Sequence, residues 1–139
     1  MFDRIALIGI GLIGSSIARG VRQKGLARTI AIATRKRETL EEARALQLGD
    51  AYFTDPAEAV KGADLVILCT PVGAYEAVMD QIAPALETGA ILSDVGSVKG
   101  HVHKVLGPKV PKGVHFVPGH PLAGTEHSGP SAGFAELFE

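Results

Sequence analysis

The fold of this chain is decided by a short stretch near its N-terminus, Ile5-Ala6-Leu7-Ile8-Gly9-Ile10-Gly11-Leu12-Ile13-Gly14-Ser15-Ser16-Ile17-Ala18. An apolar run leads into three glycines with the spacing Gly-x-Gly-x-x-Gly, and a helical pattern follows at once. Gly9 permits the tight turn after a strand, Gly11 allows a phosphate to approach the backbone, and Gly14 lets the helix pack closely on the sheet. The helix N-terminus offers N–H groups and a partial positive charge to a pyrophosphate. The stretch therefore predicts dinucleotide binding, with a glycine-rich turn kept only for packing as the alternative.

The composition fits a single globular domain. The chain has 139 residues, 46% of them hydrophobic, and its formal net charge of −1 gives no electrostatic footprint for nucleic acid or an anionic membrane. Cys69 is the only cysteine, so an internal disulfide is excluded, in keeping with a reducing compartment. The apolar run at residues 5–17 is too short to span a bilayer, and its glycines and the nearby Asp3 argue against a signal peptide. We therefore expect a cytoplasmic protein with no nucleic-acid or membrane partner.

Strands and helices are expected to alternate along the chain. The apolar runs predict strands at 4–8, 29–33, 51–53, 63–69, 90–94 and 114–117, and helices at 12–24, 38–46, from 56, 73–83 and 99–106. Asp55 is the expected N-cap of the helix that starts at Pro56. In the helix at 38–46, Leu40, Ala43 and Leu46 are expected to point inward. Six strands alternating with helices predict a doubly wound parallel α/β sheet with strand order 3-2-1-4-5-6.

Polar clusters follow the expected strands at their carboxyl ends. They are the glycine triplet after the first strand, then residues 34–37, 70–72, 94–99 and 118–126. In an open parallel sheet, ligands bind outside the carboxyl ends of the strands, where the strand order reverses. The first and fourth strands flank that reversal, so Thr70, Pro71 and Val72 are expected to face the glycine triplet across a cofactor crevice. Five loops converging on one edge indicate a site for a cofactor and a substrate.

The turn after the second expected strand bears on the choice of cofactor. An NAD site usually carries an Asp or Glu about 20 residues beyond the glycine motif, where it bonds the ribose 2′-hydroxyl. Here that position is Thr34, followed by Arg35 and two more basic residues. An acid would repel a 2′-phosphate, whereas Thr34 and Arg35 would bind it. The sequence therefore favours NADP, with a solvated basic turn and less selective binding of NAD as the alternative.

The histidines give no pattern of metal ligands. His101 and His103 are two residues apart on an expected helix, so they point to different faces. No spacing of cysteine and histidine resembles a zinc site. His115 lies inside the sixth expected strand and is expected to be packed or structural. We therefore expect no metal.

His120 and Ser97 are the candidates for chemistry. His120 stands just past the tip of the sixth expected strand, and histidine titrates near neutrality, which suits proton transfer. Position alone leaves a catalytic and a structural role open for His120. Ser97, after the fifth strand, is placed to hydrogen-bond either His120 or the nicotinamide. No Gly-x-Ser-x-Gly surrounds Ser97, which argues against hydrolase chemistry, and Lys99 is interpreted as an ordinary residue of a first helical turn.

Three segments together resemble the prephenate/arogenate (cyclohexadienyl) dehydrogenase family of tyrosine biosynthesis. They are Gly9-x-Gly11-Leu12-Ile13-Gly14-Ser15-Ser16, Asp94-Val95-Gly96-Ser97-Val98-Lys99 and Gly119-His120-Pro121-Leu122-Ala123-Gly124-Thr125-Glu126-His127-Ser128-Gly129. The resemblance runs over essentially the whole chain, and the Gly-His-Pro-Leu-Ala-Gly-Thr-Glu segment is its most specific part. It implies a Rossmann-like fold and NAD(P)-dependent oxidative decarboxylation of prephenate and/or arogenate.

The resemblance also implies roles for individual residues. His120 matches the catalytic histidine, which takes the proton of the ring hydroxyl as hydride leaves for the nicotinamide; loss of the ring carboxylate as CO₂ then aromatises the ring. Ser97 matches the serine that touches both the histidine and the nicotinamide, and Thr125 and Glu126 match positions beside the substrate and at the pocket entrance. The expected cofactor-binding residues are Gly9, Gly11, Leu12, Ile13, Gly14, Thr34, Arg35, Thr70, Pro71, Val72 and Ser97.

Members of this family are about twice as long as this chain. They carry a helical second domain, which supplies an arginine for the substrate carboxylate and most of a dimer interface. The resemblance therefore implies that residues 1–139 are a dinucleotide-binding domain without that helical domain, that the full-length protein is a homodimer acting on a small molecule, and that this chain alone turns over substrate weakly or not at all. The residues do not separate prephenate from arogenate. Two other interpretations stay open, the cofactor domain of a β-hydroxyacid-type dehydrogenase and a non-catalytic NAD(P)-binding module.

Overall fold

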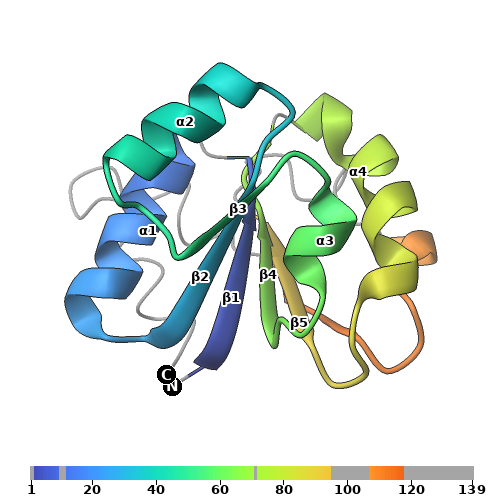
Figure 1. The fold of residues 1–139 in the computed structure, drawn as a ribbon. Helices are drawn as coiled ribbons and strands as arrows, with labels where there is room; N and C mark the ends of the chain where they lie inside the picture. Colours follow the sequence, from blue (N-terminus) through green and yellow to red (C-terminus); the bar gives the residue numbers. More distant parts are fainter. Residues whose placement is uncertain (1, 10–11, 71, 95–106, 118–139) are drawn as a thin grey trace.

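A single parallel sheet organises the protein. The computed structural model describes residues 2–9, 12–70, 72–94 and 107–117. The strands of the sheet are β1 (Phe2–Ile8), β2 (Ala27–Ala33), β3 (Ala51–Phe53), β4 (Leu65–Leu68), β5 (Ile91–Asp94) and β6 (His115–Phe116). They pair in the order β3-β2-β1-β4-β5-β6, all parallel (Figure 1). The predicted doubly wound topology is confirmed, and its reversal lies between β1 and β4.

Helices follow the strands on both faces of the sheet. They are α1 (Leu12–Lys24), α2 (Arg37–Ala45), α3 (Pro56–Val60) and α4 (Tyr75–Ile82), with 3₁₀ turns η1 (Val72–Ala74), η2 (Ala83–Ala85) and η3 (Gly107–Lys109). The start of α3 is as predicted, because the Asp55 side chain accepts a hydrogen bond from the N–H of Ala57 at 3.0 Å and Pro56 opens the helix. Within the described ranges, no helix is long and apolar enough to cross a membrane.

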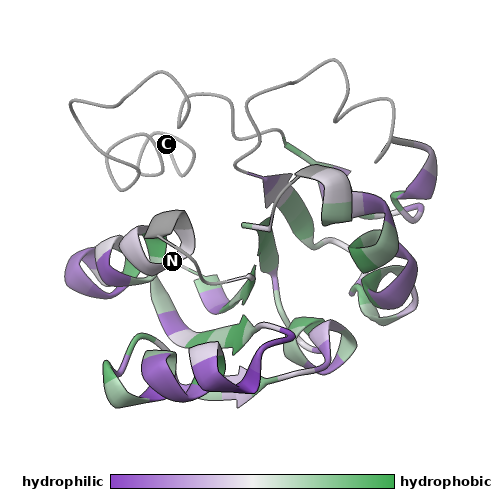
Figure 2. Cartoon of the chain, turned by 90° about the horizontal axis from the view of Figure 1, so that it is seen from above, coloured by the Kyte–Doolittle hydropathy of each residue, from purple (hydrophilic) through white to green (hydrophobic). Residues whose placement is uncertain are grey.

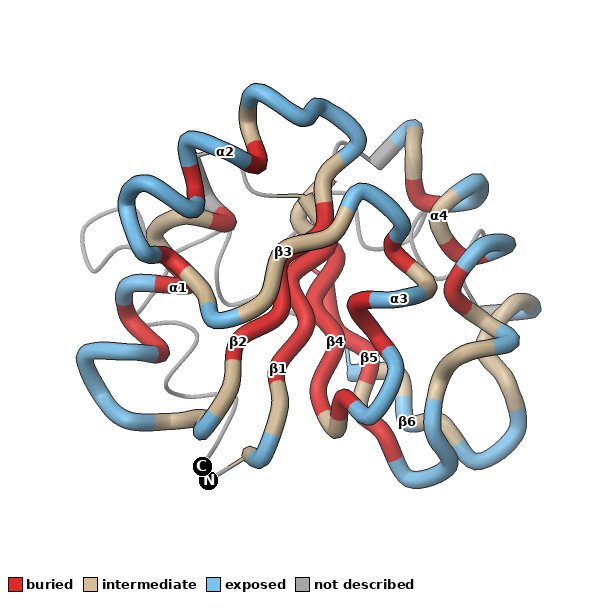
Figure 3. The backbone as a smooth tube through the Cα atoms, viewed as in Figure 1, coloured by how far each residue is buried: buried red, intermediate tan, exposed pale blue. Residues whose placement is uncertain are grey.

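The core lies on both faces of the sheet because successive strand residues point to opposite sides. On one face, Ile5 and Leu7 of β1 pack with Ile17 of α1 and Leu40 of α2. On the other face, residues of β1, β4 and β5 pack with α3 and α4. The middle strands are buried and the outer sides of the helices are exposed (Figure 3), and hydrophobic residues gather along the strands (Figure 2). Such near-continuous apolar strands are typical of a parallel sheet covered by helices.

Two carboxylates fix the amino-terminal side of the sheet. Asp64, just before β4, accepts hydrogen bonds from the backbone N–H groups of Asp3 and Arg4, at 3.0 and 2.9 Å. Asp50, just before β3, accepts one from the N–H of Ile30 at 2.8 Å. Side chains therefore help to hold the register of these strands on the amino-terminal side of the sheet.

Several predicted details were wrong. The helix expected at 73–83 is shorter than predicted, because α4 covers only Tyr75–Ile82 and the 3₁₀ turns η1 and η2 flank it. Pro84 has no N–H, so the α-helical bonding ends on its amino-terminal side. Leu46, expected to point inward, is 53% exposed. The helix ends at Ala45, and Gln47 adopts a left-handed φ of 56°, which directs Leu48 into the core instead. The helix expected at 99–106 lies outside the described residues.

Candidate functional site

The turn after β1 is pressed against the end of β4. Gly9 has a φ of +91°, and its N–H donates to the carbonyl of Ala33 at 2.7 Å. A Cβ atom on Gly9 would lie 2.8 Å from Cγ2 and 3.0 Å from the backbone N of Thr70. Both the backbone conformation and the close approach therefore require glycine. The expected proximity of Thr70 to the glycine turn is confirmed.

The third glycine brings α1 onto the same turn. A Cβ on Gly14 would lie 2.9 Å from the carbonyl oxygen of Gly9 and 3.4 Å from Cβ of Cys69. The first turn of the helix is therefore seated directly on the strand ends, as a pyrophosphate site at a helix N-terminus requires. Leu12 and Ile13 lie in this first turn and Val72 in η1, whereas Gly11 and Pro71 lie outside the described residues.

The hydroxyl of Thr70 is a candidate ligand for a cofactor. Thr70 Oγ1 is buried and has no hydrogen-bond partner within the described part of the chain. A buried hydroxyl without a partner is unfavourable by about 1–3 kcal/mol, and such groups in native proteins call for an explanation. A ribose hydroxyl or phosphate oxygen bound beside Gly9 would satisfy it. The glycine cradle and this hydroxyl together fit a dinucleotide.

Cys69 serves packing beneath the glycine turn. Its backbone N–H donates to the carbonyl of Ile8 at 2.8 Å, and its Sγ lies 3.8 Å from the carbonyl oxygen of Ile67. Burial of the thiol, and secondarily the negative charge of Asp94, raises the pKa of Cys69 from 9.0 to about 12. A thiol that stays protonated is a poor nucleophile, so its burial favours a packing role for Cys69.

A basic turn follows β2 at the same edge. The N–H of Thr34 donates to the carbonyl of Phe53 at 3.1 Å, which ties this turn to the end of β3. Arg35 is exposed, and Lys36 precedes α2 without a side-chain capping bond. The first acid in this segment is Glu38, already inside the helix. Residues 34–37, which directly follow β2, therefore include no carboxylate, whereas an NAD-selective site usually has one at this position.

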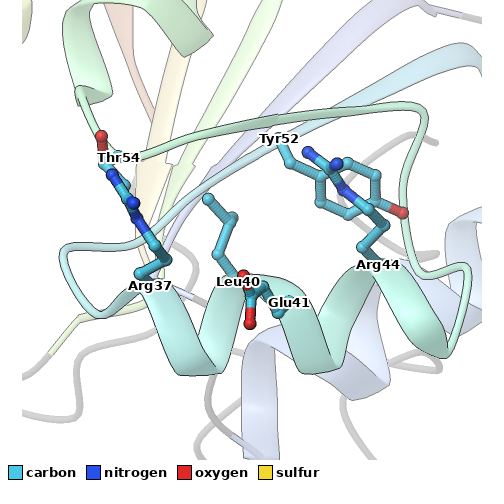
Figure 4. Close-up of a pocket in the computed structure, with 6 residues that line it drawn as sticks. All are labelled: Arg37, Leu40, Glu41, Arg44, Tyr52 and Thr54. Atoms are coloured by element: carbon cyan, nitrogen blue, oxygen red, sulfur yellow. The ribbon is translucent and has the colours of Figure 1, made fainter.

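A groove of 320 Å³ opens between α2 and the segment around β3. It is lined by Arg37, Leu40, Glu41, Arg44, Tyr52 and Thr54 (Figure 4). The guanidinium of Arg44 lies over the ring of Tyr52, 5.1 Å from its centroid. None of the predicted cofactor-binding residues that the structure describes lines this groove, and the sequence did not predict it. The spacing of Arg37 and Arg44, two helical turns apart, is the signal that was available.

The remaining predicted site residues are Ser97, His120, Thr125 and Glu126, and all four lie outside the described residues. Ser97 follows Asp94, the last residue of β5, by three positions. The prediction that His115 is packed was wrong, because His115 is exposed on β6, at the edge of the sheet. Among the residues that the structure describes, no group of three or more His, Cys, Asp or Glu side chains is placed to hold a metal ion.

Comparison with known proteins agrees with the geometry. The family described as the nucleotide-binding domain of prephenate dehydrogenase matches residues 17–139. A cyclohexadienyl dehydrogenase of Zymomonas mobilis is 48% identical over 139 residues, covering 100% of this chain and 47% of that enzyme. The chain thus spans about half the length of this relative.

Solved structures of related dehydrogenases share the fold, including one from Aquifex aeolicus and one from Synechocystis. Prephenate dehydrogenase from Aquifex aeolicus, in complex with hydroxyphenyl propionate and NAD⁺, matches with a TM-score of 0.78 and 29% identity over 91% of this chain and 44% of that one. Arogenate dehydrogenase from Synechocystis matches with a TM-score of 0.63 and 27% identity over 73% of this chain and 37% of that one. The chain therefore belongs to the prephenate dehydrogenase family, in which it corresponds to the nucleotide-binding domain.

Proposed function

We propose that this chain forms the cofactor half of an NAD(P)-dependent dehydrogenase that oxidatively decarboxylates prephenate, arogenate or both. The observation that carries the proposal is the cradle of Gly9 and Gly14 against Thr70, at the point where the strand order reverses. Family membership supplies the reaction class, because the relatives are named cyclohexadienyl, prephenate and arogenate dehydrogenases.

The chemistry is divided between the cofactor and two side chains. When bound, oxidised nicotinamide accepts a hydride from the ring carbon that carries the substrate hydroxyl. In the proposal, His120 accepts the proton of that hydroxyl, and Ser97 hydrogen-bonds both His120 and the nicotinamide. Breakage of the bond to the ring carboxylate releases CO₂ and leaves its electron pair to aromatise the ring. Thr125 and Glu126 are assigned to the substrate side and the pocket entrance, on the resemblance of residues 119–129 to the family.

The cofactor that the proposal favours is NADP. The support is the basic turn after β2, where Arg35 is exposed and Thr34 occupies the place usually held by an acid. A guanidinium binds a phosphate through charge-assisted hydrogen bonds, and an exposed one reaches a ligand without desolvation of a buried charge. NAD is the competing cofactor, and the Aquifex aeolicus structure was solved with NAD⁺.

The rest of the active site is proposed to come from a helical domain of the full-length protein. The relative from Zymomonas mobilis is covered to only 47% by this chain, which leaves room for such a domain. This domain would bind the substrate carboxylate and form most of a homodimer interface, and the protein would act in the cytoplasm. Turnover by the 139-residue chain alone should then be weak or absent.

The proposal is tested by assaying the full-length protein with each substrate and each cofactor. Turnover of prephenate or arogenate, with a higher kcat/KM for NADP⁺ than for NAD⁺, is expected. Activity only on small 3-hydroxy acids would favour a β-hydroxyacid dehydrogenase instead. Robust turnover by the 139-residue chain would contradict the proposal that a helical domain completes the active site.

A further inference from the structure

Two fully buried polar side chains meet at the carboxyl ends of β4 and β5. Tyr75 opens α4 and Asp94 closes β5, and neither is exposed to solvent. The hydroxyl of Tyr75 donates to Oδ2 of Asp94 at 3.3 Å and lies 3.5 Å from the carbonyl oxygen of Leu68. Leu68 and Asp94 are register partners, the last pair between β4 and β5. One phenol thus links a helix start to the ends of two neighbouring strands.

The hydroxyl is not needed for packing. The ring of Tyr75 lies in the apolar cluster of Val66, Met79, Ile82 and other residues, where phenylalanine would fill nearly the same volume. A buried carboxylate, by contrast, is strongly unfavourable unless hydrogen bonds compensate its lost hydration. The hydroxyl therefore acts on Asp94 and on the strand ends rather than on the core.

The position of Asp94 matters because Ser97 stands close behind it in the chain. Ser97 is three residues further along, so only two residues separate it from the end of β5. The direction in which the chain leaves β5 therefore limits where Ser97 can lie. A displacement of about 1 Å at a reacting centre can lower a rate by about 100-fold.

We propose that the hydrogen bond between Tyr75 and Asp94 positions the segment that carries Ser97, so that Tyr75 and Asp94 are positioning residues of the dehydrogenase site. This inference rests on the proposed function, because it takes Ser97 as the residue that contacts the nicotinamide.

The test uses Tyr75→Phe in the full-length protein, with Tyr52→Phe as the matched control. The hydroxyl of Tyr52 also makes hydrogen bonds, donating to the carbonyl of Gly49 at 2.6 Å and accepting from its N–H at 3.0 Å, but it lies beside β3. Tyr75→Phe is expected to lower kcat by about 10-fold while the KM for the cofactor changes by less than about twofold. Tyr52→Phe should leave kcat within about twofold of wild type, even if it lowers the melting temperature as much as Tyr75→Phe does.

A double-mutant cycle measures whether the effects of the two residues on kcat are coupled, which a merely structural role does not require. If the pair acts as one unit, kcat of the Tyr75→Phe/Asp94→Asn variant should match that of the worse single variant. The inference would be overturned if the kcat losses of the two single variants multiply in the double variant. It would also be overturned if Tyr75→Phe leaves kcat unchanged, or if Tyr52→Phe lowers kcat as much as Tyr75→Phe does.

Amide hydrogen exchange separates this inference from the proposed function. Tyr75→Phe should raise the exchange rate of residues 95–99 by about 10-fold relative to wild type, and Tyr52→Phe should leave it unchanged. If the wild-type protein turns over neither prephenate nor arogenate, the proposed function fails, and exchange at 95–99 still decides the positioning role. Unchanged exchange in Tyr75→Phe would overturn that role whatever the activity.

Discussion

A Cβ atom on Gly9 would lie 2.8 Å from Cγ2 of Thr70. These two residues lie just past the ends of β1 and β4, the strands between which the order of the sheet reverses. Position 9 therefore requires glycine for two reasons, the close approach of Thr70 and its own φ of +91°. The proposed dinucleotide site lies beside this contact.

Gly9→Ala should impair cofactor binding more than an ordinary glycine substitution does. Gly25→Ala is the matched control, because Gly25 also has a positive φ, +64°, but nothing lies within 4 Å of its added Cβ. We expect Gly25→Ala to lower the free energy of unfolding by about 1 kcal/mol and to leave affinity unchanged. Gly9→Ala should weaken NADPH binding by at least about 10-fold, because the turn must shift away from Thr70. Fluorescence titration with NADPH and urea denaturation measure the two effects; wild-type affinity in Gly9→Ala would refute this interpretation of the turn.

Arg35→Ala should weaken NADP⁺ binding by about 10- to 100-fold and leave NAD⁺ binding within about twofold, because only NADP⁺ carries the 2′-phosphate. Thr34→Asp should reverse the preference, since a carboxylate repels the phosphate and bonds the ribose hydroxyl. Arg28→Ala is the control, because Arg28 is an exposed arginine near the amino-terminal end of β2, whereas Arg35 follows its carboxyl-terminal end. Calorimetric titration of each variant with both cofactors gives the ratios. Equal losses for NAD⁺ and NADP⁺ in Arg35→Ala would remove the basis for preferring NADP.

The Cys69 thiol should make stability fall with rising pH in the alkaline range. Burial, and secondarily the charge of Asp94, raises its pKa from 9.0 to about 12. Between these values the unfolded chain has lost a proton that the folded protein keeps, so ionisation favours unfolding as pH rises. The difference in free energy of unfolding between wild type and Cys69→Ala should be constant below pH 8 and should decline above about pH 9. Urea denaturation at several pH values checks this, and parallel pH curves for the two proteins would contradict it.

Much of the fold follows from local signals in the sequence. The bounds of α1 and the cap of α3 were predicted because the glycine motif and the sequence Asp55-Pro56 fix these helix starts by residues close in the chain. The exposure of Leu46 was not predictable in this way. It depends on a left-handed residue, Gln47, that a helical period does not reveal.

The contacts within the site depend on strand register. The proximity of Thr70 to Gly9 was expected, because the order of the strands alone brings the ends of β1 and β4 together. The bond between Tyr75 and Asp94 was not, because it joins residues 19 positions apart through the pairing of β4 with β5. The roles of Ser97 and His120 stay predictions, carried by the resemblance of their segments to the family.

The most direct test of the account is the kcat of His120→Asn in the full-length protein, measured beside His115→Asn. His115 is an exposed histidine on β6, five residues earlier in the chain, and serves as the matched control. Loss of a general base should lower kcat by about 100-fold or more in His120→Asn, with NADPH affinity unchanged, whereas His115→Asn should keep wild-type turnover. A His120→Asn enzyme that retains kcat within about twofold of wild type would contradict the proposed role of His120 and would indicate that another residue is the general base.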